Sequence, residues 1–341
     1  MAKSLSIAMR GSLSRFHALV YPDSTSQRTC SMQNKKSVYG TLPREELASL
    51  LAITGSVHWK QALRDLDLPV MRSKIDWFVD ESRANPYLIM PCKGTGMALD
   101  IGAGSGIISA VAARRFSSVI AFEFLPELCN FMAKRFAQDN IQNVSIVRGN
   151  ALAIPFAQNI FDLAIVNGVL EWVPDFVRSK NPEEVQVDFL RQVYSTLKDK
   201  GRIGIAIENR YYYLHFLGQT PHNEPPFVTI MPRWMADPLA KRKTGKPYRN
   251  YIYSYWGYKR LLQKSGFKNI EIYILLPDYY NPVMMVSTGS PKALRGLFSK
   301  YNLDSAKAGR RQSFIKMILR ALLACNIYHF FGHSFLVTGE K

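Results

Sequence analysis

Between residues 97 and 209, short apolar runs alternate with longer segments whose apolar residues recur at helical spacing. The apolar runs predict strands over residues 97–102, 118–123, 144–149, 161–168 and 202–209. The longer segments predict helices over residues 106–116, 126–140 and 182–201. Strands and helices that alternate in this way form a mostly parallel sheet with helices on both faces. This stretch therefore predicts an α/β fold.

The flanking regions differ from this alternating stretch in composition. Residues 1–41 are rich in Ser and basic residues and contain one acid, so they predict a disordered tail, with an organelle transit peptide as the alternative. Residues 42–95 show helical spacing broken by Gly or Pro and predict a helical cap. Residues 96–341 predict the main domain, with an aromatic, ordered lid over 209–253 and a basic helical insertion over 288–331. Further strands are predicted over residues 269–276, 283–287 and 333–340.

The chain of 341 residues carries 44 Lys and Arg against 26 Asp and Glu, a formal net charge of +18. This excess favours an anionic partner, and nucleic acid, a membrane surface and a phosphorylated substrate all meet that requirement. No stretch of about 18 uncharged apolar residues occurs. The sequence therefore predicts a cytoplasmic protein without a transmembrane segment, with peripheral membrane contact left open.

The four cysteines, Cys30, Cys92, Cys129 and Cys325, lie far apart in the sequence and form no CxxC pair. No histidine lies at zinc-ligand spacing from them. The sequence therefore predicts neither a metal site nor a disulfide framework, and it fits a reducing compartment.

A glycine-rich turn, DIGAGSG at residues 100–106, lies where the first strand of the alternating stretch leads into its first helix. Its glycines allow the backbone to approach a ligand, and we expect them to point amide donors at it. Glu123 ends the next strand, where a carboxylate is able to accept both hydroxyls of a ribose. The turn and the acid together predict a site for a nucleoside-containing cofactor.

Dinucleotides and S-adenosylmethionine both bind at turns of this kind, and two residues separate them here. The dinucleotide fingerprint requires a small residue where this chain has Ile107. Asp100, just before the turn, would oppose the negative charge of a pyrophosphate. The details therefore favour S-adenosylmethionine.

Four stretches carry a resemblance to a known family: DIGAGSG at residues 100–106, Glu123, GNALAIPF at residues 149–156 and FDLAIVNGVLEWV at residues 161–173. With them, the chain resembles the class I S-adenosylmethionine-dependent methyltransferases, in particular their small-molecule, type 11-like branch. The resemblance implies S-adenosylmethionine as the cofactor. It also implies a Rossmann-like, seven-stranded, mostly parallel sheet with flanking helices, to which the helical cap and the lid are added.

The resemblance implies a cofactor role for nine residues at the ends of the predicted strands. They are Asp100, Gly102, Gly104, Gly106, Glu123, Phe124, Asn150, Ala151 and Asn167. The aspartate and the glycines would line the methionine and ribose end of the cofactor. Glu123 would hold the ribose diol, Phe124 would stack on adenine, and Asn167 would face the transferred methyl group.

Asn150 departs from the family pattern, which usually has Asp at this position. Its amide oxygen is still able to accept from the adenine amino group, but it carries no charge. Two interpretations stay open: Asn150 meets the adenine edge together with Ala151, or it is a turn former. Glu123 has a similar alternative as a solvated acid at a strand end.

Methyl transfer from a sulfonium needs little side-chain chemistry, because alignment of the reacting atoms supplies most of the rate gain. If the acceptor is a hydroxyl, a general base assists, and the candidates are His222, Glu171 and His215. Each has a structural alternative, since Glu171 is suited to capping the following turn and a histidine among aromatics is often a packed residue. The strand end at residues 167–170, NGVL, lacks the Pro-Pro-aromatic signature of enzymes that methylate exocyclic base amines.

The lid carries more cations than acids and interleaves them with aromatic residues. Such pairs suit a phosphate together with a sugar or a base. The predicted acceptor contacts are Arg210, Tyr211, Arg233 and Trp234. The lid also loosely resembles those of bacterial methyltransferases associated with surface-polysaccharide or glycolipid assembly. We therefore expect a small-molecule or glycan-type, anionic acceptor, with an RNA methyltransferase and a non-catalytic S-adenosylmethionine-binding protein as alternatives.

Residues 308–331 combine four cations with apolar residues at spacings that give one apolar face. Such a pattern is typical of a surface helix packed on a core. The basic residues that precede it favour contact with an anionic membrane surface. Packing is the expectation, and membrane contact is the alternative.

Overall fold

The computed structural model describes residues 19–20, 37–38, 42–54, 56–65, 75–91, 94–177, 179–220, 225–245, 247–248, 250–290, 294 and 310–341. Most of the predicted tail and of the segment before residue 310 therefore lies outside the described residues, as do Cys30 and Cys92. The chain divides into two compact units. The first unit comprises Met1–Ile165, Arg191–Arg202 and Lys341, and the second comprises Val166–Leu190 and Ile203–Glu340.

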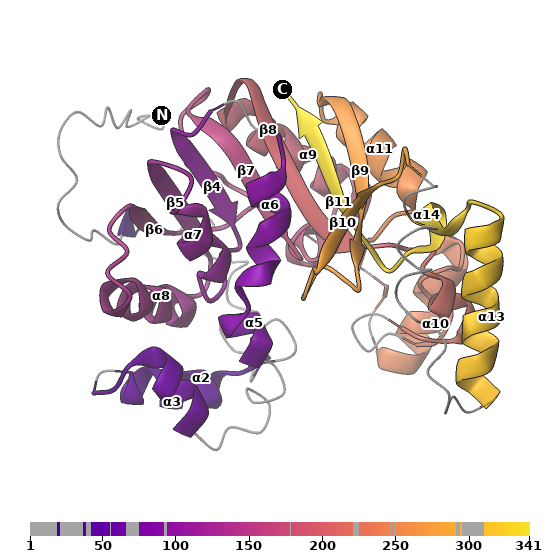
Figure 1. The fold of residues 1–341 in the computed structure, drawn as a ribbon, viewed down its shortest axis with the longest axis horizontal. Coiled ribbons are helices and arrows are strands. Elements are labelled where there is room, and N and C mark those ends of the chain that lie inside the picture. The colour runs from indigo at the N-terminus through magenta and orange to yellow at the C-terminus, as the bar shows by residue number, and fades with distance from the viewer. Residues whose placement is uncertain are drawn as a thin grey trace. The chain divides into compact units, whose positions relative to one another are not determined.

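Parallel strands form the sheet of the first unit, in the order β1-β6-β5-β4-β7-β8 (Figure 1). Their bounds are β1 Leu19–Val20, β4 Met97–Ile101, β5 Ser118–Glu123, β6 Val144–Arg148, β7 Phe161–Asn167 and β8 Leu197–Glu208, of which β7 and β8 continue into the second unit. β4 and β5 pair in parallel, with Leu99 opposite Ile120, and Ser145 of β6 lies opposite Ile120 on its other side. This register places the carboxyl ends of β4, β5 and β6 next to one another.

The helix α7 (Ile107–Ala112) connects β4 to β5, and α8 (Pro126–Gln138) connects β5 to β6. α8 begins with proline followed by Glu127, and both are favoured in a first helical turn. Its buried face recurs at helical spacing and consists of Leu128, Cys129, Phe131, Met132, Arg135 and Phe136. An arginine on this face is unusual, because charged side chains are seldom buried without partners.

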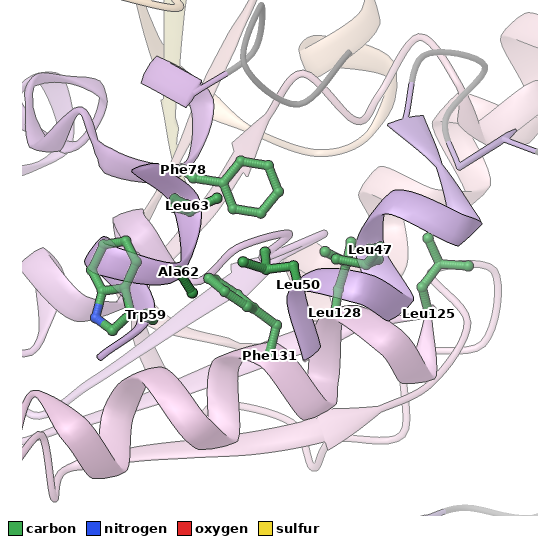
Figure 2. Close-up of a cluster of buried hydrophobic side chains, with 9 residues drawn as sticks. All are labelled: Leu47, Leu50, Trp59, Ala62, Leu63, Phe78, Leu125, Leu128 and Phe131. Atoms are coloured by element: carbon green, nitrogen blue, oxygen red, sulfur yellow. The ribbon is translucent and has the colours of Figure 1, made fainter. Parts of the chain in front are cut away.

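Short helices precede β4, and several of them pack on α8. They are α2 (Arg44–Ile53), α3 (Trp59–Asp65), α5 (Ile75–Val79), η1 (Glu81–Ala84) and α6 (Asn85–Ile89). Figure 2 shows Trp59 of α3 and Leu50 of α2 beside Phe131, within a cluster of nine buried apolar residues. Trp59 and Phe131 meet edge to face at 6.1 Å between ring centroids. A separate two-stranded sheet joins β2 (Ser37–Val38) to β3 (Leu42–Pro43).

Antiparallel strands complete the sheet of the second unit, in the order β7-β8-β11-β9-β10 (Figure 1). The new strands are β9 Lys268–Leu276, β10 Met284–Ser287 and β11 Ser334–Glu340. Ile274 of β9 lies opposite both Val286 of β10 and Phe335 of β11. The helix before β9, α11 (Tyr255–Lys264), begins after Ser254, whose hydroxyl accepts from the Gly257 amide. The helix between β7 and β8 is α9 (Pro182–Thr196), which contributes to both units.

The lid and the segment before β11 contribute further helices to the second unit. These are η3 (Tyr213–Leu217) and α10 (Arg233–Thr244) in the lid, α13 (Arg310–Ala324) and α14 (Tyr328–Phe331) before β11, and the short η2 (Val173–Phe176) after β7. Ala236 and Ala240 of α10 pack with Val228 and Tyr248 in a small apolar cluster. Among the helices of the described residues, none is long and apolar enough to cross a membrane.

The predicted α/β class and the mostly parallel sheet are confirmed. Two details differ from the prediction. Within the described residues, the sheet has nine strands rather than the seven that the resemblance implies, because β1 and β10 extend its two edges. The helix predicted over residues 182–201 ends at Thr196, since the strand ladder uses the backbone beyond it: Ile160 donates to the Thr196 carbonyl and Lys341 to the Gly201 carbonyl. The predicted limits of the cap, lid and insertion stay predictions.

Candidate functional site

The glycine turn of the first unit joins β4 to α7 and needs glycine for its conformation. Gly102, Gly104 and Gly106 all have positive φ, at 69°, 59° and 76°. L-residues with a Cβ adopt such angles only at a cost. Gly106 is restricted further, because an added Cβ would lie 2.7 Å from the ring of Phe136 and 2.8 Å from Met132. The turn therefore tolerates no side chain at this position unless the Phe136 and Met132 side chains of α8 move.

The amide groups of the turn are largely used within the protein. Gly102 and Ala103 both donate to the Phe122 carbonyl, at 2.8 and 3.2 Å, and Gly106 donates to the Ala103 carbonyl at 2.9 Å. Gly104 donates to the Glu123 carboxylate at 2.9 Å. We expected these groups to point at a ligand, and instead they hold the turn against the end of β5. The turn thus offers bare backbone for close approach rather than a row of free donors.

Glu123 is the anchor of this turn and is buried. One carboxylate oxygen accepts from Gly104, and the other accepts from the amides of Phe124 at 2.8 Å and Leu125 at 2.9 Å. Glu123 is therefore not a solvated strand-end acid, because its carboxylate is buried against the turn that it anchors.

Asp100 lies at the end of β4 and is also buried. Its carboxylate accepts a 2.6 Å hydrogen bond from the Ser109 hydroxyl of α7. Burial raises the pKa of Asp100 to about 6, against the lowering effects of Ser109 and the Arg83 charge, while the Glu123 charge raises it further. Near neutral pH this site therefore holds a carboxylate that gains from any positive charge brought near it.

Arg135 is a positioning residue that the sequence analysis did not identify. It is buried in α8, and its guanidinium donates to the carbonyls of Phe78 at 2.9 Å and of Ser105, within the turn, at 3.2 Å. The same group lies 4.1 Å from the ring centre of Trp59. Burial lowers the pKa of Arg135 to about 10. Arg135 thus ties the glycine turn to α5 and to the cluster of Figure 2.

The end of β6 brings Asn150 close to β5, because Gly149 donates to the Glu123 carbonyl at 2.9 Å. The Asn150 side chain accepts from the Leu152 amide at 2.9 Å, which is the geometry of a turn former. Phe124 and Ala151 are both half-buried. The structure therefore brings the predicted residues of the first unit to the carboxyl ends of β4, β5 and β6, while the adenine contact of Asn150 stays a prediction.

The end of β7 belongs to the second unit and contains Asn167, which is buried. Gly168 follows with φ of 63° and donates to the Ala206 carbonyl of β8 at 2.9 Å. Tyr279 packs directly on it, since an added Cβ on Gly168 would lie 3.1 Å from the phenol. Gly168 therefore allows Tyr279 to approach the strand end.

Glu208, at the end of β8, forms a second feature that the sequence analysis missed. Its carboxylate accepts from the hydroxyl of Tyr279 at 3.0 Å and of Tyr280 at 3.3 Å. Burial, and then the Glu208 charge, raises the pKa of Tyr279 well above its usual range. The Glu171 charge contributes to the same shift, so both glutamates act on this buried phenol. The only sequence signal was an acid at a strand end and the YY pair 71 residues later.

The predicted base candidates have different surroundings. Glu171 is buried, whereas His222 lies outside the described residues. His215 is buried, and its Nδ1 lies 3.1 Å from the Arg210 carbonyl while its ring packs edge to face on Tyr212. The contacts of His215 are thus those of a packed residue.

The predicted acceptor residues divide into two pairs. Arg210 donates to the carbonyls of residues 229, 230 and 231, at 2.9, 3.5 and 2.6 Å. Arg233 donates to the Ile252 carbonyl at 2.9 Å, and its guanidinium lies 3.8 Å from the ring centre of Tyr251. Trp234, in contrast, is 76% exposed, and Tyr211 is also exposed. The arginines hold the lid together, and the aromatic residues face outward.

Within the described residues, no cluster of three or more His, Cys, Asp or Glu is arranged to hold a metal ion. Of the two cysteines described, Cys129 and Cys325, neither forms a disulfide. Burial raises the pKa of the Cys129 thiol to about 12, which leaves it protonated and unreactive near neutral pH.

Comparison with known families identifies one matching region. Residues 99–205 match the family model described as "Methyltransferase domain". This region runs from within β4 to within β8 and includes the glycine turn, Glu123, Asn150 and Asn167.

Two curated proteins show the range of relatives. The chain is 26% identical over 125 residues to protein-L-isoaspartate O-methyltransferase 2 of Rhodopseudomonas palustris, a match that covers 35% of this chain and 54% of that protein. It is 23% identical over 189 residues to a demethylmenaquinone methyltransferase of Lactiplantibacillus plantarum, covering 51% of this chain and 70% of that protein. The chain thus matches about half the length of the first of these relatives.

Among solved structures, the chain resembles phosphoethanolamine N-methyltransferase 2 of Haemonchus contortus, crystallised with phosphomonomethylethanolamine and S-adenosylhomocysteine. The two are 15% identical with a TM-score of 0.44, and the alignment covers 77% of this chain and 52% of that one.

Proposed function

We propose that the protein is a class I, S-adenosylmethionine-dependent methyltransferase that methylates a small or glycan-type, anionic acceptor. Residues 99–205, which match the family model of a methyltransferase domain, would carry this activity. The observation that carries this proposal is the glycine turn at the end of β4, with three positive φ angles and a buried carboxylate anchoring it. The acceptor class rests on the lid.

The turn suits S-adenosylmethionine better than a dinucleotide. A pyrophosphate is bound by free amide donors at such a turn, but here the amides of Gly102, Ala103, Gly104 and Gly106 already donate within the protein. S-adenosylmethionine carries positive charge on its sulfonium and ammonium groups and has no phosphate. The buried carboxylates of Asp100 and Glu123 complement such a ligand.

The cofactor, when bound, supplies a methyl group already activated on a sulfonium. The residues of the chain then have to hold and align the reactants. Glu123 is held in place by backbone amides at the end of β5 and would take the ribose hydroxyls. Asp100, with a pKa of about 6, is ionised near pH 7 and would stabilise a nearby positive charge.

A hydroxyl acceptor would lose a proton, and buried carboxylates of the second unit are candidates to receive it. Glu171 and His222 remain the proposed bases. Glu208 joins them, because its carboxylate is held in place by two tyrosine hydroxyls beside the end of β7. Such support fixes the carboxylate, as a proton acceptor requires.

The exposed residues of the lid support an anionic acceptor. Lys241, Arg242 and Lys243 at the end of α10 are exposed, and Trp234 at its start presents an open aromatic face. A phosphate and a sugar ring would find complementary partners there. Arg210 and Arg233 would shape the lid rather than contact the acceptor, given their internal partners.

Calorimetry with S-adenosylmethionine and S-adenosylhomocysteine tests the cofactor site directly. We expect both to bind, and we expect Gly104→Val to abolish binding because a branched side chain blocks the approach. Glu123→Gln should weaken binding by about 1.5–3 kcal/mol, the value of a hydrogen bond to a charged group. NADH serves as the control ligand. Tight binding of NADH without binding of S-adenosylmethionine would contradict the proposal.

Labelled methyl transfer into fractionated extracts tests the acceptor class. We expect label in small-molecule, glycan or glycolipid fractions. Label confined to RNA would move the assignment to an RNA methyltransferase. Tight cofactor binding with no label in any fraction would favour a binding protein without turnover.

A further inference from the structure

Helix α13 (Arg310–Ala324) has apolar residues on two of its sides. On one side Leu319 and Leu323 are buried, so the helix packs on its own unit, as the sequence analysis expected. Ile315, Ile318 and Leu322 beside them are half-buried. These contacts account for only part of the apolar surface of the helix.

The other side of α13 is exposed and is also apolar. Phe314 is 49% exposed and Met317 is 56% exposed, and Ala321 and Ala324 are exposed as well. Their spacing of three, four and three residues places them on one stripe along the helix. When a helix is apolar on its solvent side as well as on its packed side, we expect a partner molecule or a membrane to cover the solvent side. We call Phe314, Met317, Ala321 and Ala324 the exposed stripe.

The charge of α13 indicates what covers the stripe. The helix contains four cations and no Asp or Glu. Arg320, which is exposed, and Lys316, which is half-buried, lie within the same turns as the stripe. A basic helix with an outward apolar stripe is the pattern of a segment that lies in the interface of an anionic membrane.

The other possible occupants fit less well. Nucleic acid phosphates would pair with the cations, but they would leave Phe314 and Met317 without an apolar partner. A second copy of α13 would bring four cations against four cations. The helix is also too short to span a bilayer, since its 15 residues cover roughly 22 Å at 1.5 Å per residue.

We propose that α13 docks the second unit on an anionic membrane surface, with the exposed stripe among the lipid acyl chains and Lys316 and Arg320 at the headgroup phosphates. This inference goes beyond the proposed methyltransferase activity and does not depend on it. It gives the excess positive charge of the chain a specific role on one helix.

Co-sedimentation of the full chain with vesicles tests the proposal. The vesicles are phosphatidylcholine alone and phosphatidylcholine mixed with phosphatidylserine. We expect binding to the mixed vesicles, weakened by salt, and little binding to phosphatidylcholine alone. Lys316→Gln with Arg320→Gln should lower the partition coefficient by roughly 25-fold, at about fivefold for each cation.

Two matched controls distinguish a specific role of α13 from an effect of net charge and from non-specific hydrophobic binding. Arg260→Gln with Lys268→Gln removes the same charge from exposed positions outside α13 and should change the partition coefficient far less. Phe314→Ser with Met317→Ser should weaken binding, whereas Ile89→Ser with Val283→Ser, at other exposed apolar positions, should not. Circular dichroism of every variant checks that the fold is kept.

Three results would overturn the proposal. The first is a folded chain that stays in the supernatant with both vesicle types. The second is an equal loss of binding in the α13 charge variant and in the control charge variant, which would mean that the net charge of the chain alone causes the binding. The third is salt-sensitive binding to RNA that the α13 charge variant loses, without vesicle binding, which would make α13 a nucleic-acid contact.

Discussion

The glycine turn of the first unit and the arginine-rich lid of the second unit carried comparable functional signals in the sequence, but the structure uses them differently. In the turn, the glycines adopt the positive φ angles that their identity predicts. In the lid, Arg210 donates to the Met231 carbonyl and Arg233 donates to the Ile252 carbonyl, both within the lid itself. A glycine in such a turn indicates a specific backbone conformation. An arginine is equally compatible with binding a ligand and with binding acceptors of the protein itself.

The chemistry of guanidinium explains this ambiguity. Its five donors are able to form hydrogen bonds with backbone carbonyls and also with phosphates. Arg233 also lies over the rings of Tyr251 and Tyr248, at 3.8 and 4.6 Å, so the interleaved aromatics serve as internal cation–π partners. Burial, and then the Arg233 charge, lowers the pKa of Arg210. The alternation of cations and aromatic residues in the lid therefore stabilises the fold of the lid through internal contacts.

Two glycines with nearly the same backbone angle give the largest expected effect and test the two regions directly. Gly106→Ala in the turn combines an unfavourable φ of 76° with a clash against Phe136, and should lower the free energy of unfolding by about 2–5 kcal/mol. Gly245→Ala after α10 has φ of 74° but no atom within 4 Å of the added Cβ, and should cost only about 1–2 kcal/mol. Urea denaturation measures both. Equal costs would mean that the turn is not tightly packed on α8.

Substitution of Arg135 should have the next largest effect, because this residue of α8 donates directly to the Ser105 carbonyl of the turn. Arg135→Met keeps much of the apolar length but leaves the carbonyls of Phe78 and Ser105 without this donor, and should cost about 2–4 kcal/mol. We also expect weaker binding of S-adenosylmethionine. The control is Arg114→Met, since Arg114 is exposed and its pair with Glu81 contributes at most about 1 kcal/mol. If the Arg135 variant is destabilised but its cofactor affinity is unchanged, the turn does not need Arg135 to bind the cofactor.

The lid variants test whether Arg210 serves the fold or the acceptor. Arg210→Met should lower the free energy of unfolding by about 2 kcal/mol, because three carbonyl groups lose a charged donor. Trp234→Ala should change stability by less than about 0.5 kcal/mol, as expected for an exposed side chain, and should raise the KM for the acceptor. The opposite result, in which Arg210→Met keeps its free energy of unfolding but has a higher KM for the acceptor, would indicate that Arg210 contacts the acceptor.

Much of the fold was predictable because its signals are local. The strand runs and the loop glycines follow from hydrophobic period and backbone geometry, and the observed β4, β5 and β7 lie within a residue of their predicted limits. The missed residues act over long sequence distances. Arg135 reaches carbonyls 57 and 30 residues away, and Tyr279 reaches Glu208 across 71 residues. No pattern within a helix or strand reports such pairs.

The outer side of α13 was missed for a related reason. Its apolar spacing predicted packing, and Leu319 and Leu323 do pack. The spacing places Phe314 about half a helical turn away from Leu323. It could not reveal that this second side is exposed, because burial depends on what the rest of the chain covers.

Asp100 distinguishes a structural from a cofactor-binding carboxylate, because the two roles predict opposite dependences on pH. Burial raises the pKa of Asp100 from 3.8 to about 6, so the folded chain holds this proton more tightly than the unfolded chain. Its contribution to the free energy of unfolding is therefore greatest below about pH 4 and is lost as the pH rises through 6. Asp100→Asn should remove this part of the pH dependence.

Cofactor affinity should change in the opposite direction if Asp100 faces the positive charge of S-adenosylmethionine. Between pH 5 and pH 7 the ionised fraction of a group with a pKa near 6 rises about tenfold, so the affinity should rise by at most about tenfold, or 1.4 kcal/mol. Calorimetry at both pH values, with Asp100→Asn as the control, measures this change. An affinity that is flat with pH, beside a stability that still falls, would assign Asp100 to its hydrogen bond with Ser109 alone. Opposite slopes in the same protein would show that the ionised form of Asp100 binds the cofactor better but lowers the free energy of unfolding.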